Sequence, residues 1–64
     1  MPAMIMMQGM YLKDAHFKED VMATEWTAAQ KKAFVFDLQE GANQMLTAMR
    51  KFDRALFDAR VVEP

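Results

Sequence analysis

The feature that most constrains the fold of this chain is a seven-residue repeat of apolar and small residues in a proline-free stretch, residues 28–60. Apolar side chains at this spacing are typical of a helix that packs lengthwise on another helix. Small side chains in such a repeat allow two helix backbones to approach closely. The repeat forms a small stripe of Gly41, Ala48 and Ala55 beside an apolar stripe of Val35, Leu38, Met45, Met49, Phe52 and Leu56.

The repeat predicts one long helix over about residues 27–60. Thr27 is the expected cap, because Gln30, three residues later, can reach back to the cap amide. Gly41 is the one interior residue that favours a break, and the sequence at 41–43 resembles a helix C-terminal signal, so two helices joined by a turn are the alternative. The repeat passes through Gly41 without a change of phase, which favours the continuous helix.

The rest of the chain divides into two segments. Residues 1–12 hold five of the eight methionines and show no clear period, which indicates an apolar arm, either extended or irregularly helical. Residues 13–23 predict a short amphipathic helix, with Phe17 and Val21 one turn apart. The sequence therefore predicts an all-α protein, a single small helical domain over residues 1–64 with its long C-terminal helix packed against other chains.

Size and composition predict that this helix has a partner. The 64 residues are 53% apolar and include no cysteine. A chain of this length buries only about 60% of the surface that its unfolded form exposes, and without disulfides association is the usual source of extra stability. The alternative is packing against the helix at 13–23, which is too short to cover the stripes. We expect a protein partner or a second copy of this chain, within an oligomer or larger complex.

The predicted partner-binding residues lie on two sides of the long helix. The main contact is expected to consist of Val35, Leu38, Gly41, Met45, Ala48, Met49, Phe52, Ala55 and Leu56. Phe36 and Phe57 project outside the stripes and predict a second contact surface. Exposed aromatic side chains covered by the stems of neighbouring lysines and arginines are the alternative.

No group of side chains carries identifiable catalytic or metal chemistry. The methionines at 4, 6, 7 and 10 offer thioether ligands for Cu(I), but copper-binding segments usually add His or Cys, and methionine is an ordinary filler of irregular surfaces. His16 and Asp20 lie one turn apart on the predicted short helix, and no further ligand completes a site. The chain has no serine, and Gly9 and Gly41 are too far apart to form a phosphate-binding loop. We expect no enzymatic activity, no cofactor and no metal.

Charge disfavours nucleic acid as the partner. The formal net charge is −1, whereas nucleic-acid-binding domains are strongly basic. Four cations gather near the end of the long helix, but Asp53 and Asp58 interrupt them, and cations at this end also stabilise the helix dipole. The cations are Arg50, Lys51, Arg54 and Arg60.

The apolar stretch 3–12 is too short for a membrane span, which needs roughly 20 residues. It also has no basic residue before it, as a secretory signal peptide would have, so we expect a cytoplasmic protein.

These features predict a small non-enzymatic accessory or structural subunit that acts through helix-mediated contacts in a larger assembly. The long helix would dock in a groove of the partner, and the methionine-rich arm would anchor it. The alternative is a homodimeric helical regulator, either a small inhibitor of an enzyme or a nucleic-acid-binding bundle.

Overall fold

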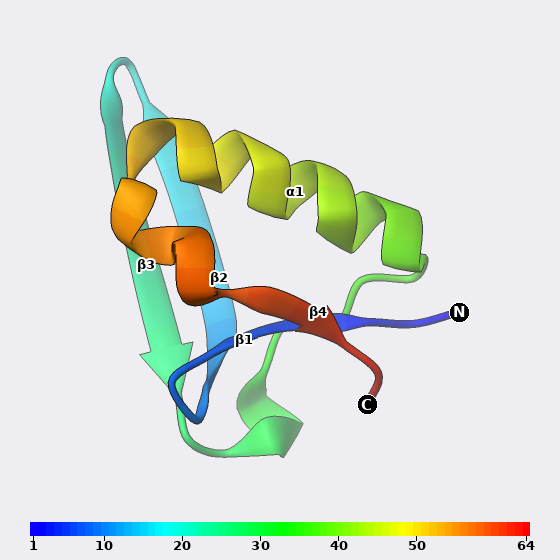
Figure 1. The fold of residues 1–64 in the computed structure, drawn as a ribbon. Helices are drawn as coiled ribbons and strands as arrows, with labels where there is room; N and C mark the ends of the chain where they lie inside the picture. The colour runs from blue at the N-terminus through cyan, green and yellow to red at the C-terminus, as the bar shows by residue number, and fades with distance from the viewer.

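The computed structural model describes all 64 residues as a four-stranded antiparallel sheet with one α-helix across one face (Figure 1). The strands are β1 (Met4–Met7), β2 (Met10–Lys18), β3 (Val21–Thr27) and β4 (Arg60–Val62). The helices are α1 (Gln39–Phe52) and two short 3₁₀ helices, η1 (Gln30–Lys32) and η2 (Arg54–Asp58). The strand order is β3-β2-β1-β4, so β3 and β4 are the edges of the sheet. The prediction of an all-α protein with a long C-terminal helix is wrong.

Two tight turns explain why the first part of the chain forms strands. Gln8 and Gly9 have φ angles of 52° and 78°, the backbone of a two-residue hairpin turn between β1 and β2. A second two-residue turn joins β2 to β3, and its first residue, Glu19, has a φ of 56°. Strands β1, β2 and β3 therefore form a meander, which replaces both the predicted apolar arm over 1–12 and the predicted helix over 13–23.

The predicted long helix is shortened at its N-terminal end because the residues before α1 make backbone contacts with the sheet. Thr27 ends β3, and its hydroxyl accepts a hydrogen bond from the Ala29 amide at 3.1 Å, but only the short η1 follows. Phe36 exchanges two backbone hydrogen bonds with Ala3, at 2.8 and 3.0 Å, and the Phe34 amide donates to the Leu12 carbonyl at 2.9 Å. Aromatic and β-branched residues such as these favour extended backbone, so α1 begins only at Gln39.

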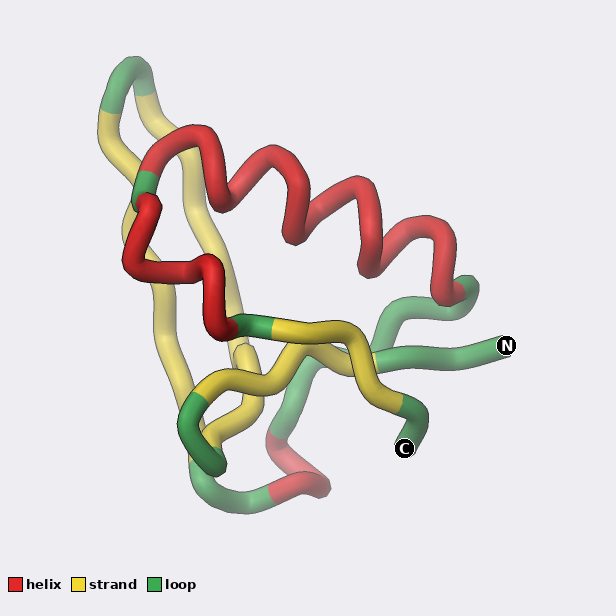
Figure 2. The backbone as a smooth tube through the Cα atoms, in the orientation of Figure 1, coloured by secondary structure: helices red, strands yellow, loops and turns green.

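At its C-terminal end, α1 stops at Phe52. The Asp53 carboxylate accepts a hydrogen bond from the Ala55 amide at 2.9 Å, which starts η2 as a separate helical turn. Figure 2 shows that the chain reverses at this point, so that η2 runs back beside the end of α1. The predicted 27–60 helix is therefore replaced by η1, α1, η2 and β4, and Gly41 lies within the first turn of α1.

The core lies between α1 and the sheet. Helix α1 buries Ala42, Leu46 and Met49, which are spaced so that they share one face. The complete core cluster consists of Ala3, Ile5, Leu12, Ala42, Leu46, Met49, Leu56 and Ala59. Much of the helix face expected to meet another chain is thus covered by the protein's own sheet. The expectation that the rest of the chain was too short to cover it assumed a short helix at 13–23, and a sheet is much wider.

A bulge in β2 decides which side chains face α1. Leu12 pairs with Trp26 and Asp14 pairs with Glu25, so Lys13 is the extra residue. The bulge shifts the alternation of side chains by one position, which places Phe17 on the same face as Leu12.

The fold contains no helix with the length and apolar character needed to cross a membrane.

Candidate functional site

The predicted partner-binding residues occupy several elements and differ in exposure. Val35, Phe36 and Leu38 precede α1, whereas Ala55, Leu56 and Phe57 belong to η2. Met49 and Leu56 are buried in the core, and Phe36, Gly41, Met45 and Ala48 are half-buried. Those that remain exposed are Val35, Leu38, Phe52, Ala55 and Phe57. The exposed residues fall into two groups, one at each end of α1.

Phe57 is the most exposed large apolar side chain in the protein, at 79%. It lines a shallow hollow with Arg50 and Arg54. Its neighbour Leu56 is buried in the core, so η2 is anchored by one residue and presents the next one to solvent. We call Arg50, Lys51, Arg54 and Phe57 the basic–aromatic surface.

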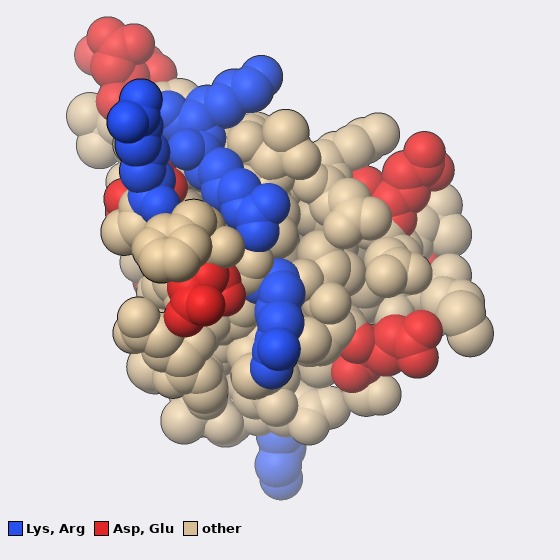
Figure 3. Space-filling model, in the orientation of Figure 1, with Lys and Arg blue, Asp and Glu red and all other residues tan.

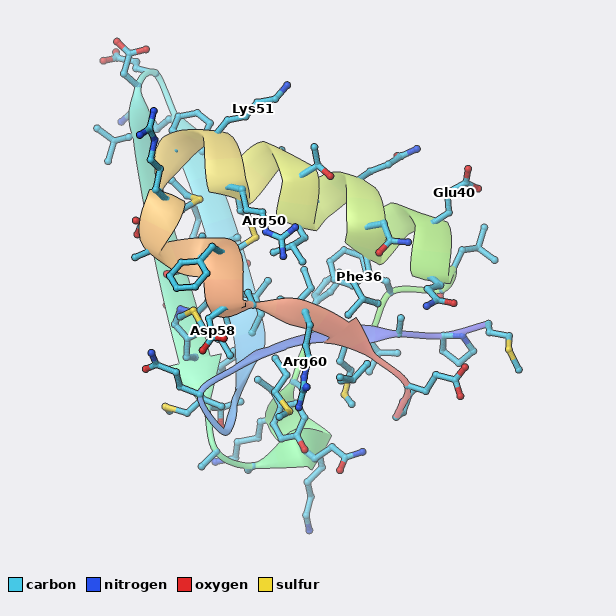
Figure 4. All side chains as sticks on the ribbon, in the orientation of Figure 1. Phe36, Glu40, Arg50, Lys51, Asp58 and Arg60 are labelled. Atoms are coloured by element: carbon cyan, nitrogen blue, oxygen red, sulfur yellow. The ribbon has the colours of Figure 1, made fainter.

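Arg50 fixes η2 against α1. Its Nη2 donates a hydrogen bond to the Ala59 carbonyl at 2.6 Å, and its Nε donates to the Leu56 carbonyl at 3.4 Å. Figure 4 shows the Arg50 side chain leaving α1 in the direction of η2. These contacts satisfy carbonyl groups at the end of η2 with a charged donor, the stronger kind of hydrogen bond. The backbone on both sides of Phe57 is therefore held against α1.

Charge is unevenly distributed over this face. Figure 3 shows lysine and arginine side chains over the C-terminal half of α1 and over η2, with acidic side chains beside them as well as near the start of α1 and near the C-terminus. The only ion pair in the protein joins His16 and Asp14 at 2.9 Å, so no lysine or arginine is in direct contact with a carboxylate. Asp58, on η2, adjoins the surface (Figure 4). The surface is thus basic but interrupted.

A pair of aromatic rings lies on another side of the end of α1. The ring centroids of Phe17, on β2, and Phe52, the last residue of α1, are 5.2 Å apart with planes tilted by 54°. Such tilted contacts are favourable for aromatic rings. Both rings remain partly exposed, at 40% and 46%, so the end of α1 carries apolar surface in addition to Phe57.

A separate apolar cavity of about 210 Å³ opens beneath the middle of α1. It is lined by Leu12, Asp14, Ala15, Phe34, Phe36 and Met45. The rings of Phe34 and Phe36 meet edge to face, with centroids 4.8 Å apart, and form one wall. A cavity of this size can hold one apolar side chain, since about 150 Å³ accommodates benzene in an engineered core.

No protein-family model, curated protein or solved structure matches this chain. No group of three or more His, Asp or Glu side chains is placed to hold a metal ion. The His16–Asp14 pair is the one arrangement of a potential base with an orienting carboxylate, and their side chains are 68% and 48% exposed. What this face does offer is exposed cationic and apolar side chains.

Part of this candidate surface is among the residues singled out from the sequence. The sequence analysis identified Phe57 and the gathering of Arg50, Lys51 and Arg54, but assigned the cations to stabilising the end of a long helix. It missed Phe17, because the contact with Phe52 depends on the bulge in β2. No signal in the sequence alone indicates that bulge.

Proposed function

We propose that this protein is a small non-enzymatic accessory subunit that binds a protein partner through the basic–aromatic surface. The segment that it recognises is acidic and apolar. We further propose that the protein acts in the cytoplasm, an expectation that rests on the sequence. The observation that carries the proposal is the exposed Phe57 ring beside two arginine side chains.

The exposure of Phe57 supports a binding role. Aromatic residues and arginine are enriched at the centres of protein interfaces, where a few of them supply most of the binding energy. Complete burial of a Phe side chain contributes about 1.5–3 kcal/mol relative to leaving it exposed. Because Arg50 already holds η2 in place, little ordering of this segment opposes binding.

The charges support an acidic partner. Lys51 and Arg54 make no ion pair within the protein, so carboxylates of a partner could approach them without displacing an existing contact. Complementary charge raises the association rate and selects the partner. Asp53 and Asp58 favour a protein segment over nucleic acid, since a continuous phosphate backbone would be repelled at both positions.

Zero-length crosslinking can test the proposal. A tagged form of the chain is purified from the cells that make it and treated with a carbodiimide, which joins lysine amines to carboxylates that contact them. The expected result is a crosslink from Lys51 to an Asp or Glu of another protein, with apolar residues next to that position. Lys31, on η1 at a distant part of the fold, serves as the internal control.

Two variants separate this surface from the rest of the protein. Phe57→Ala should reduce recovery of the crosslinked partner at least about tenfold, the effect of a loss of about 1.4 kcal/mol. Phe34→Ala removes a half-exposed ring at the cavity under α1 and should leave recovery unchanged. Crosslinks from Lys31 instead of Lys51, equal recovery with Phe57→Ala, or nucleic acid as the only bound species would overturn the proposal.

A further inference from the structure

The outer edge of β3 is a row of backbone groups without partners. Strand β3 has a neighbouring strand, β2, on one side only and is an edge of the sheet (Figure 1). Lys18 and Val21 close the two-residue turn and pair with each other, so Val21 directs its backbone N–H and C=O towards β2, and alternate residues follow it. Met22, Thr24 and Trp26 direct theirs outwards, and none of these three forms a backbone hydrogen bond outside the hairpin.

This edge lacks the features that usually prevent pairing. Exposed edge strands are commonly short, or are protected by lysine, proline, a bulge or a covering segment. Strand β3 has seven residues, and Glu25 is its only charged side chain. The opposite edge, β4, has three residues, begins with Arg60 and is followed closely by Pro64. Only β3 is open to a further strand.

The sequence of β3 is complementary to itself in one antiparallel register. With Thr24 opposite Thr24 of a second copy, Met22 lies opposite Trp26 of that copy, and Ala23 lies opposite its Glu25. The outward-facing residues then meet one another, so Met22, Thr24 and Trp26 all find backbone partners. The side chains also match, because threonine pairs well with threonine across strands and methionine contacts aromatic rings favourably.

The neighbouring registers are less favourable. A shift of two positions in one direction places Glu25 opposite Glu25 of the second copy, and like charges directly opposite each other repel. The same shift in the other direction places Trp26 opposite Asp20, a turn residue, and leaves Trp26 outside the strand pairing. Glu25 and the turn therefore select the register centred on Thr24.

We propose that this protein forms a homodimer by antiparallel pairing of its two β3 strands in this register. The two four-stranded sheets join into one continuous sheet, and the two-fold axis passes between the Thr24 residues. Because this axis is perpendicular to the sheet, both α1 helices lie on the same face. The dimer is held by backbone groups of β3, whereas the basic–aromatic surface consists of side chains on α1 and η2, so the two proposals rest on different residues and can fail independently.

Charge changes at Ala23 can test the dimer without disturbing the core, since this side chain is exposed on the face away from α1. Ala23→Glu places a carboxylate opposite Glu25 of the second copy, twice per dimer, and should raise the dissociation constant roughly 2- to 30-fold. Ala23→Lys places an opposite charge there and should lower the constant by a similar factor. The double variant Ala23→Glu with Glu25→Lys should restore dimerisation.

Sedimentation equilibrium over a wide concentration range measures these constants, with circular dichroism to check that each variant is folded. The wild type should increase from 7.4 kDa towards twice that mass as its concentration rises. Gln44→Glu, on the exposed side of α1, adds the same charge as Ala23→Glu away from the edge and should leave the constant unchanged. A wild type and an Ala23→Lys variant that both remain monomeric would overturn the proposal, as would a dimer insensitive to every change at Ala23.

Discussion

Replacing Gly41 by alanine should raise the free energy of unfolding by about 0.4–1 kcal/mol, because alanine restricts the unfolded chain and favours a helix. Gly41 lies in the first turn of α1 and does not have a positive φ. An added Cβ would lie 3.8 Å from Cδ2 of Phe36, an ordinary van der Waals distance. The methyl group therefore fits without any movement. For a chain of this size the melting temperature should rise by about 2–8 °C.

Gly9→Ala is the matched control because the same atoms are added in a different backbone conformation. Gly9 has a φ of 78° and no heavy atom within 4 Å of an added Cβ. Only backbone strain acts there, and it should lower stability by about 1–2 kcal/mol. Urea denaturation followed by circular dichroism, together with thermal melts, measures both variants.

The sign of the Gly41 effect is the decisive result. If Gly41 lay in a closely packed seam between two helices, the extra methyl group would lower stability by about 1–3 kcal/mol. A fall in melting temperature for Gly41→Ala would therefore refute the packing of α1 on the sheet described above. An unchanged melting temperature for Gly9→Ala would refute the assigned turn.

Two further substitutions test the core and the tether of η2. Met49→Ala removes a fully buried side chain and should lower the free energy of unfolding by about 2–5 kcal/mol. This is a large part of the roughly 3–10 kcal/mol expected for the whole chain. A loss below about 1 kcal/mol in urea titrations would contradict the burial of Met49. Arg50→Gln removes the charged donor to the Ala59 carbonyl and should lower the free energy of unfolding by about 1 kcal/mol, less than the loss of a buried charged hydrogen bond, because Arg50 is exposed. Amide hydrogen exchange in η2 should become faster. Unchanged exchange in η2 would argue against a role of Arg50 in holding η2 to α1.

Part of the helical region could be predicted from the sequence. Helix α1 lies inside the predicted 27–60 segment, and its buried face includes Ala42 and Met49, which share one position of the repeat. The extent of the helix could not be predicted, because it ends where tertiary contacts begin. Phe36 bonds to Ala3, which is far away in the sequence, and such bonds outweigh the weak helix preference of the residues before Gln39.

The sheet could not be predicted from the sequence because its strands and turns lack the residues that usually indicate them. Methionine favours helix over strand, and the first strand is rich in it. The turn at Gln8-Gly9 has glutamine in place of the Asn or Asp of the usual Asn-Gly or Asp-Gly pair, and the turn at Glu19-Asp20 has no glycine. Strand β1 is stabilised in addition by β4, from the other end of the chain, a pairing that no local pattern reveals.

Part of the candidate site could be predicted from the sequence because its cationic residues are close together in the chain. The gathering of Arg50, Lys51 and Arg54 is local in sequence, and it survives as a surface because the end of α1 and η2 are also local. The bonds from Arg50 to the Leu56 and Ala59 carbonyls depend on the reversal of the chain at Asp53. A continuous helix would have kept these groups apart, so their role could not be inferred from the repeat.

Strand β1 lies between β2 and β4, the second and the last strands in chain order. Met4 pairs with Val62, and Met6 pairs with Arg60. During synthesis β2 and β3 can pair as soon as they emerge, whereas one side of β1 has no strand beside it until residues 60–62 follow. Pairings between distant segments form late and leave apolar surface exposed in the meantime. A folding chain therefore carries a methionine-rich strand that is open on one side until β4 pairs with it, and this pairing is the step that completes the sheet.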